Sequence, residues 1–282
     1  MKRILLILIL TICTRSFSQD VAFTQSFMIP ESINPSFSGF YQTTKAGLLY
    51  KNQQWSGFNF NLNSQYIYFD DWLPNLNSGI GISLINHQET VTNYNLKQVN
   101  VNWAYDVQIN YDWHFRPSIS LGFGFKDYGF DNLLFEDQIN IYQNIINSNT
   151  FDPIVLNENS RYFDFGASFL FNNDYSWVGL TLRHLNRPNV SMVSQGDTPL
   201  DIFVSLHASL ELPVLNYNDD NSIFLITNFM MQGKYDRFDL GFQYVFDRFS
   251  LGLTATTNPI QTSEKSHFIT SINPVIGMAW EG

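Results

Sequence analysis

The sequence predicts an all-β chain that forms a transmembrane antiparallel β-barrel of about 12–14 strands. Three observations predict it: a leader that directs export, apolar residues that alternate with polar ones, and a composition poor in charge. Only 14% of the residues are charged, against about 25% in ordinary soluble domains. Phe alone occurs 26 times. Such a chain has more apolar surface than a soluble protein of this length usually hides.

Residues 1–18 have the features of a secretory signal peptide. Two basic residues precede an apolar run from Ile4 to Ile12, and small residues follow it. The run is too short for a spanning helix, which needs about 20 residues. We therefore expect cleavage before Gln19. The alternative is a lipoprotein acylated at Cys13, although Ile12 stands where that signal normally has a small residue.

Charge and cysteine content exclude several function classes. The chain has 15 basic and 25 acidic residues and a net charge of −10. So acidic a chain is a poor match for nucleic acid, and no such partner is expected. Its one cysteine lies in the leader, so the mature chain would have no disulfide and no thiolate nucleophile. The five histidines lack the spacing of a metal site, and we expect neither metal nor cofactor.

Alternation with a period of two residues predicts the strands. The longest run extends from Val99 to Phe115, with apolar residues at most odd positions. Because that length would overshoot a bilayer, we expect a turn near Asn110 to Asp112. The other predicted strands cover residues 46–52, 57–69, 79–84, 118–126, 162–171, 177–185, 201–212, 223–231, 238–246, 249–255 and 275–280.

The second face of these strands favours a membrane barrel over a soluble sandwich. A sandwich would carry many charged residues there, whereas this chain has Gly, Ser, Asn and Gln. We expect the apolar face to meet lipid and the polar face to line the interior. Residues 19–43 are predicted to be an irregular segment inside or beneath the lumen, and residues 44–282 the barrel. The long polar connections at 129–160 and 186–200 are the surface expected to meet a partner.

Inside the barrel we expect ion pairs, and at its rims an aromatic girdle. The six tryptophans are assigned to strand ends or to the lipid face. Lumenal acids are expected to pair with basic residues across the interior. The acids are Asp106, Asp164, Asp201, Glu211 and Asp239, and the bases are Lys97, Lys126, Arg161, Arg183 and Arg237.

Several stretches resemble the PorP/SprF-like outer-membrane proteins of Bacteroidetes type IX secretion and gliding motility. The resemblance extends over most of the mature chain, but the carboxyl end departs from the usual barrel pattern because two residues follow Trp280. The stretches that carry it are residues 23–25, Ile33-Asn34-Pro35, Gly39, Tyr50 to Phe58, Gly79 to Leu84, Asn100 to Tyr105, Asp152-Pro153 and Phe163 to Ala167.

The resemblance implies a non-enzymatic barrel of the cell outer membrane that crosses the lipid many times. Its implied partners are a secreted cargo or adhesin with a carboxyl-terminal sorting domain, other type IX secretion components, and outer-membrane lipid. Such a protein helps its cargo reach or remain on the cell surface. The family-bearing positions are Asn34, Pro35, Gly39, Gln54 and Trp55, for which we expect a role in fixing the amino-terminal segment or in contacting the cargo.

Two alternatives remain open. A transport barrel for a small or apolar solute would have the same alternating strands. An outer-membrane hydrolase could use His207 with Ser205 or Ser209, which share the polar face of one predicted strand. Residues two apart in a strand point in parallel, so we expect poor geometry for proton transfer.

Overall fold

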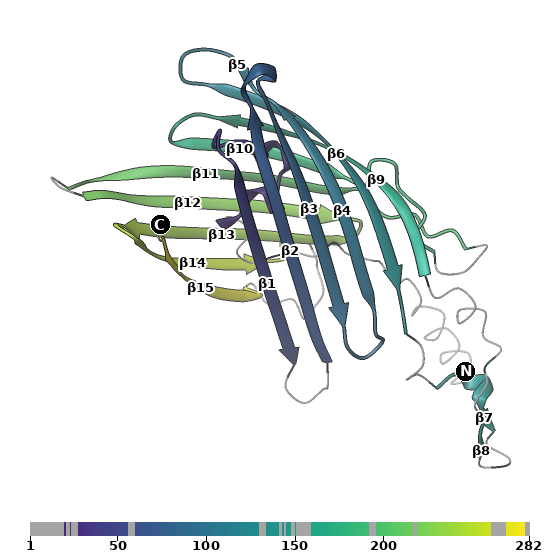
Figure 1. Ribbon diagram of the computed structural model, residues 1–282. Helices are drawn as coiled ribbons and strands as arrows, with labels where there is room; N and C mark the ends of the chain where they lie inside the picture. Colours follow the sequence, from purple (N-terminus) through teal and green to yellow (C-terminus); the bar gives the residue numbers. More distant parts are fainter. Residues whose placement is uncertain are drawn as a thin grey trace.

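The computed structural model describes residues 20, 23, 28–55, 60–129, 134–140, 143, 145–147, 150, 159–191, 196–216, 219–260 and 269–279. Most of them lie in one antiparallel sheet, which Figure 1 shows from the side. Its strand order is β1-β2-β3-β4-β6-β9-β10-β11-β12-β13-β14-β15, with the short β5 pairing only with β6. The antiparallel ladders confirm the fold class, and the path has twelve strands among the described residues, within the predicted range of about 12–14.

Every predicted strand has its counterpart. The bounds are β1 Lys45–Trp55, β2 Phe60–Leu73, β3 Ser78–Glu89, β4 Asn95–Tyr105, β5 Val107–Gln108, β6 His114–Asp127, β9 Asn159–Asn172, β10 Ser176–Arg183, β11 Phe203–Asn216, β12 Asp219–Gln232, β13 Tyr235–Phe246, β14 Phe249–Thr257 and β15 Ser271–Met278. A separate hairpin pairs β7 Ile139–Asn140 with β8 Ile145–Ile146. Short 3-10 turns are η2 Pro30–Ser32, η3 Pro35–Phe37, η4 Pro74–Leu76 and η6 Glu136–Gln138.

The long alternating run breaks where expected. β4 ends at Tyr105, β5 folds back on the start of β6, and the turn between them lies at residues 109–113. Asn110 closes this turn, because its side-chain oxygen accepts hydrogen bonds from the backbone N–H groups of Asp112 and Trp113. At the other end of the chain, β15 stops at Met278, before the predicted end at Trp280, which lies outside the described residues.

The sheet has the inverted burial of a membrane barrel. In β9, Ser168 is fully buried, whereas its neighbour Phe169 is 38% exposed. The same holds in β11, where His207 is 1% exposed and Leu206 is 52% exposed. Polar residues therefore face inward and apolar ones face outward, the arrangement that lipid requires. No helix of the described residues is long and apolar enough to cross a membrane.

The connections differ between the two ends of the sheet. The three longest, at residues 128–158, 184–202 and 258–270, all lie at one end, here the long-loop end. The opposite, short-turn end has connections such as 74–77, 173–175 and 247–248, and it is also where β1 begins and β15 stops. The β7–β8 hairpin stands away from the sheet at the long-loop end (Figure 1).

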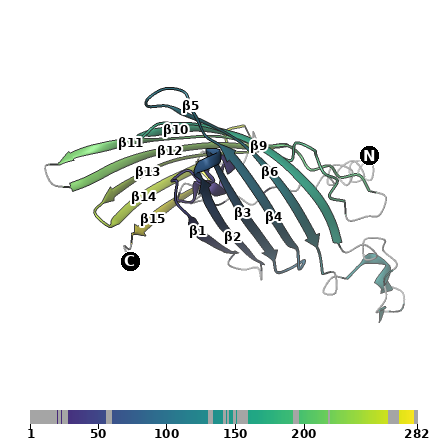
Figure 2. The same cartoon turned by 45° about the horizontal axis from the view of Figure 1, so that its top comes forward.

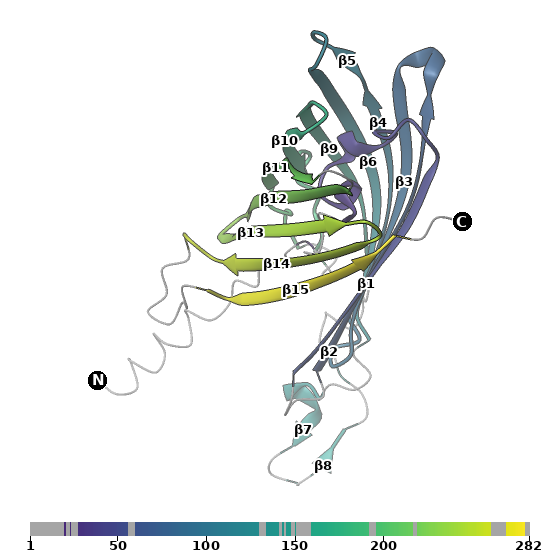
Figure 3. The same cartoon turned by 90° about the vertical axis from the view of Figure 1, so that its left-hand side faces the viewer.

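The sheet is arched, and the amino-terminal segment lies in its hollow. Figure 2 shows the arch, with β1 to β4 on one side and β11 to β15 on the other. In Figure 3 the purple segment with η2 and η3 stands between these two sides. Its residues Asn34, Ser36 and Phe37 are no more than 1% exposed. The lumen of the described structure is therefore occupied by the chain's own amino-terminal segment.

Candidate functional site: the occupied lumen

The buried part of the amino-terminal segment is shaped by two prolines. Pro30 and Pro35 each occupy the first position of a 3-10 turn, where the missing N–H is not needed. Asn34 caps the second turn, because its side-chain oxygen accepts a hydrogen bond from the Ser36 N–H at 2.7 Å. The sequence Asn-Pro therefore starts a tight turn whose backbone is partly satisfied before it meets the barrel wall.

The amide of Asn34 also ties the segment to the wall. Its nitrogen lies 3.1 Å from the carbonyl oxygen of Phe169 and 3.0 Å from Nε2 of His207. Since the Asn34 oxygen already accepts from Ser36, this nitrogen is the donor, so Nε2 of His207 is the acceptor. The proton of the neutral His207 ring then sits on Nδ1 and points to Ser205 Oγ at 3.1 Å. Ser205 in turn donates to Asn228 at 2.8 Å, which completes a chain of neutral hydrogen bonds.

Arg116 is the main charged anchor of the segment. Its guanidinium donates to the carbonyl oxygens of Ser36 at 3.1 Å and Ser38 at 2.9 Å. It also pairs with Asp106 at 2.9 Å, and its side chain is only 2% exposed. The Ser36 hydroxyl completes the attachment through Ser118 of β6 and Ser168 of β9, at 3.0 and 3.1 Å.

Glycine allows the segment to lie directly on the wall near the short-turn end. A Cβ on Gly79 would stand 1.8 Å from the carbonyl oxygen of Ser38, so no larger residue fits without a backbone shift. Gly39 has a φ of +64°, a left-handed conformation that favours glycine. Its N–H donates to the carboxylate of Asp70 at 2.6 Å. Asp70 is thus a buried anchor of the segment.

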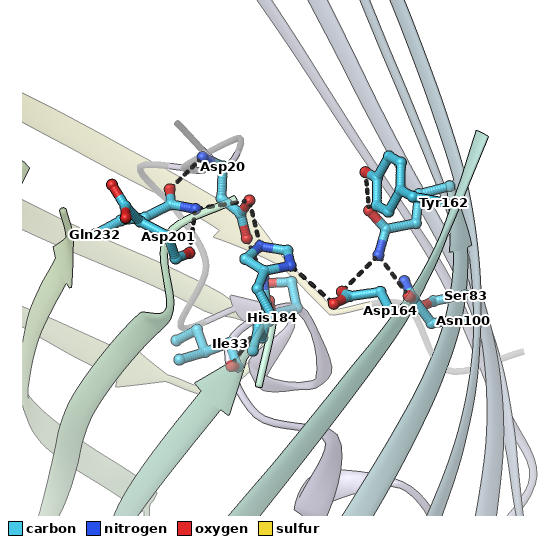
Figure 4. Close-up of polar contacts among 12 residues, drawn as sticks. Asp20, Ile33, Ser83, Asn100, Tyr162, Asp164, His184, Asp201 and Gln232 are labelled. Atoms are coloured by element: carbon cyan, nitrogen blue, oxygen red, sulfur yellow. Dashed lines mark hydrogen bonds and ion pairs between the residues drawn. The ribbon is translucent and has the colours of Figure 1, made fainter. Parts of the chain in front are cut away.

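Asp20, the first described residue of this segment, is held by a second and charged set of contacts (Figure 4). Its carboxylate lies 2.8 Å from Nε2 of His184 and 3.6 Å from Arg183. Nδ1 of His184 lies 2.9 Å from the carboxylate of Asp164, so the imidazole stands between two carboxylates. The Asp20 N–H donates to Gln232 at 2.7 Å.

The two carboxylates keep His184 charged. Burial alone would lower the pKa of its imidazole, but Asp20 and Asp164 outweigh burial and raise the pKa to about 9. For Asp20, burial would raise the pKa, but His184 and Arg183 outweigh it and hold the pKa below its ordinary value. The contact is therefore an ion pair over the whole range near neutrality.

Polar residues continue from Asp164 across the lumen, where they border a small cavity. Gln98 lies 3.3 Å from Asp164 and accepts from the Tyr162 hydroxyl at 3.2 Å. The cavity is about 40 Å³, which is room for a few water molecules. Glu31 borders it, and both of its carboxylate oxygens are buried without a hydrogen-bond partner among the described residues. Burial raises the pKa of Glu31 to about 7, and the nearby Asp70 adds to this rise.

The family-bearing positions fall into two groups. Asn34, Pro35 and Gly39 lie together in the lumen, in the contacts described above. Gln54 and Trp55 end β1 at the long-loop end, where their backbones pair with Asn61 and Phe60 of β2. The structure does not bring the two groups together. Cargo contact by any of these positions stays a prediction.

Most of the ion pairs observed in the lumen join other residues than those predicted. Arg237 pairs with Asp239 at 2.9 Å, but both lie on β13, so this pair does not cross the interior as predicted. Lys97 and Arg161, however, are exposed and on the outward parity, so they are not lumenal partners. Asp106 pairs with Arg116 and Asp164 with His184, two bases that the sequence analysis did not assign.

Two further expectations need correction. Trp177 is not in an outer girdle, because its ring packs against two residues inside the barrel. Its ring centroid lies 5.1 Å from that of Phe37 and 5.6 Å from that of His207. Ser205 and His207 lie within hydrogen-bond distance, with Ser205 Oγ 3.1 Å from Nδ1 of His207, although parallel side chains two apart in a strand were expected to have poor geometry for proton transfer. Both are buried, at 0% and 1% exposure. Among the described residues, no group of three or more His, Cys, Asp or Glu side chains could hold a metal ion.

Sequence reasoning missed Asp20, Arg116 and His184 as anchors. A signal existed for Arg116, since it is the only Asp, Glu, Lys or Arg between Asp112 and Lys126. For Asp20 and His184 there was none, because each lies outside a strand and the contact joins residues 164 positions apart.

Comparison with known proteins agrees with this architecture. The family model described as "Type IX secretion system membrane protein PorP/SprF" matches residues 15–281. The chain belongs to the PorP/SprF family. A search of curated proteins finds no match.

Two solved structures are similar at low identity. One is a KdgM porin, with 8% identity, a TM-score of 0.37, and coverage of 76% of this chain and 89% of that chain. The other is the beta domain of the Bordetella autotransporter Brka, with 10% identity, a TM-score of 0.42, and coverage of 83% and 95%. Both similarities are low, and the fold described above follows from the strand pairing of this chain alone. Family membership and these ladders together indicate an outer-membrane β-barrel linked to type IX secretion.

Proposed function

We propose that this PorP/SprF barrel is a non-enzymatic accessory of type IX secretion that holds one particular secreted protein during export or at the cell surface. The barrel crosses the outer membrane many times, with its short turns toward the periplasm and its long loops outside. The partner is a secreted cargo or adhesin with a carboxyl-terminal sorting domain, as the family resemblance implies.

The observation that carries this proposal is the occupied lumen. Asn34 and Ser36 are completely buried, and Arg116 fixes two carbonyl groups of the same segment to the wall. A barrel that transports solutes needs a lumen through which they can pass, and here the chain's own residues fill that space. The occupied lumen therefore favours a binding role over the transport alternative. Ser205 and His207, the pair considered for a hydrolase, are both buried, so a substrate could not reach this serine.

The test is affinity purification of the tagged protein from native outer membranes in mild detergent, followed by mass spectrometry. We expect one dominant secreted protein with a sorting domain, together with secretion components. Deletion of the gene should reduce export or surface retention of that same protein and leave other secreted proteins unchanged. A barrel that purifies alone, and whose deletion alters only solute uptake, would refute the proposal and favour transport.

A further inference from the structure

Glu31 is a buried acid of the lumen that lacks a partner. It lies in η2 of the amino-terminal segment, is only 5% exposed, and borders the cavity of about 40 Å³. Neither of its carboxylate oxygens has a hydrogen-bond partner among the described residues. A charge buried in this way is normally paired with a base or bound to a metal ion. Glu31 must therefore either take up a proton or bind a cation.

The other charges that border the cavity are already balanced. Asp20 and Asp164 are the other two acids there, and they lie 2.8 and 2.9 Å from His184. Arg183 also borders the cavity and lies 3.6 Å from Asp20. Two acids thus face two bases in this group. The charge of Glu31 is additional to them.

The charged residues near Glu31 on β1 and β2 do not neutralise it. Asp70 of β2 acts on Glu31 as a like charge, and Oδ1 of Asp70 is also buried without a hydrogen-bond partner among the described residues. Lys45 of β1 attracts Glu31 electrostatically, but its amine stands over the ring of Tyr41, 2.9 Å from the centroid. Two acids share one base here, so negative charge is in excess beside the cavity.

Side chains of β3, β4 and β6 add oxygen atoms to the lining of the cavity. They use hydrogen-bond donors within the wall. Ser120 donates to Asn102 at 2.7 Å, Gln98 donates to Asn100 at 2.8 Å, and Asn100 donates to Ser83 at 3.4 Å (Figure 4). Each acceptor oxygen keeps a further lone pair. Neutral oxygen atoms together with one carboxylate are ligands that suit a hard cation.

We propose that this cavity binds one alkali-metal cation between Glu31 and the oxygen atoms of β3 and β4. The cavity has room for an ion with one or two water molecules, since a water site needs about 10–15 Å³. The ion links η2 to the wall and so helps to hold the amino-terminal segment in the lumen. This site belongs to the barrel alone and does not depend on the proposed function.

A monovalent ion fits this site better than a divalent one. Glu31 supplies a single unpaired carboxylate, and the other acids that border the cavity are held by bases. Among the described residues, no three His, Cys, Asp or Glu side chains come together as a metal site. Calcium normally takes several carboxylate ligands, and magnesium demands a near-ideal octahedral geometry.

The experiment is equilibrium binding of radioactive sodium, or of radioactive rubidium as a tracer for potassium, to the purified barrel in non-ionic detergent. Glu31→Gln removes the charge and keeps the size of the side chain, whereas Glu31→Asp keeps the charge. Asp174→Asn is the matched control, because Asp174 is an exposed acid in the turn between β9 and β10. Heat-modifiable migration on gels confirms that each variant forms its barrel.

We expect a single cation per barrel in the wild type and in Asp174→Asn, no measurable binding in Glu31→Gln, and weaker but measurable binding in Glu31→Asp. Binding of either sodium or rubidium supports the proposal.

Three results would overturn the proposal. If the wild-type barrel binds neither ion, Glu31 is neutralised by a proton. If Glu31→Gln binds as well as the wild type, the ion lies elsewhere. If an equal concentration of calcium displaces the tracer, the site is not one for a monovalent ion. Should Glu31→Gln fail to form its barrel, wild-type crystals grown with rubidium decide the question. An anomalous-scattering peak beside Glu31 supports the site, and its absence overturns it.

Discussion

The two ends of the amino-terminal segment are held in the lumen by different chemistry. Residues around Asn34 and Ser36 are attached by neutral hydrogen bonds and one arginine, close to the wall. Asp20 is attached by ion pairs to Arg183 and His184. The first set depends on shape and the second on protonation. One segment can therefore be fixed permanently at one end and respond to pH at the other.

This contrast also follows the axis of the barrel. Gly39 contacts Gly79 and Asp70, next to the short-turn end. Asp20 contacts Gln232 and His184, which lie where β12 and β10 end toward the long loops. The shape-dependent attachment is thus on the side where β1 begins, and the charged attachment is on the side of the connections proposed to meet the partner.

The largest expected effect comes from replacing Arg116 with Met. The change leaves the carbonyl oxygens of Ser36 and Ser38 buried without their donor and removes one of two basic partners of Asp106, whose carboxylate still lies 2.9 Å from His114. Breaking a buried pair costs about 3–5 kcal/mol, and the remaining His114 contact places the expected loss at the lower end of that range. Urea unfolding of the barrel in lipid vesicles measures the loss. Arg161→Met is the matched control, because Arg161 is exposed and stacks on Phe125. Equal losses for the two variants would show that Arg116 does not anchor the segment.

Gly79→Ala should have the next largest effect. The new methyl group would meet the Ser38 carbonyl oxygen at 1.8 Å, so the segment must move away from β3. Overpacking of this kind costs about 1–3 kcal/mol. The expected result is faster protease cleavage of the amino-terminal segment from the folded barrel. Gly166→Ala is the control, since its Cβ would stand 3.0 Å from its nearest neighbour. Unchanged cleavage in Gly79→Ala would mean that the segment does not rest on this wall.

Asn34→Ala should have a smaller effect, measured by urea unfolding of the barrel in lipid vesicles. It removes the cap of η3 and the donor to His207, together worth about 1–2 kcal/mol. Asn52→Ala on β1 is the control, because Asn52 is exposed. If the two variants unfold at the same urea concentration, the Asn34 contacts contribute nothing measurable.

A feature of this structure could be predicted from the sequence when neighbouring residues determine it, and could not when distant residues do. The strands of β6 and β9 follow from alternation, because the period of two and the demands of lipid act residue by residue. Some predicted strands are shorter than the observed ones, mainly where polar residues continue the strand. In β3, for example, the strand extends through Asn86 to Glu89. The Asn34 turn was visible as Asn-Pro. The contact of Asp20 with His184 was not visible, because it depends on how a segment outside the sheet folds into the lumen.

Deprotonation of His184 at high pH should have the smallest effect on the stability of the whole barrel. It is also the most direct test of the difference between the two ends of the segment. Its pKa in the folded chain is about 9, above the unfolded value of 6.5, so its stabilising effect is complete below pH 6.5 and is lost as pH rises through 9. The pKa of Asp20 is lowered from 3.8, so its contribution is present above pH 3.8 and is lost only in stronger acid. The attachment of Asp20 should therefore be firm between these values and loosen from pH 6.5 to 9. Hydrogen exchange of the Asp20 amide, corrected for its intrinsic pH dependence, measures this loosening.

In His184→Gln the pH dependence should disappear, whereas the amides of Ser36 and Phe37 should keep the same protection at every pH in both proteins. Loosening of Ser36 together with Asp20 would show that the two ends open as one unit, and the distinction between a shape-held end and a charge-held end would be wrong.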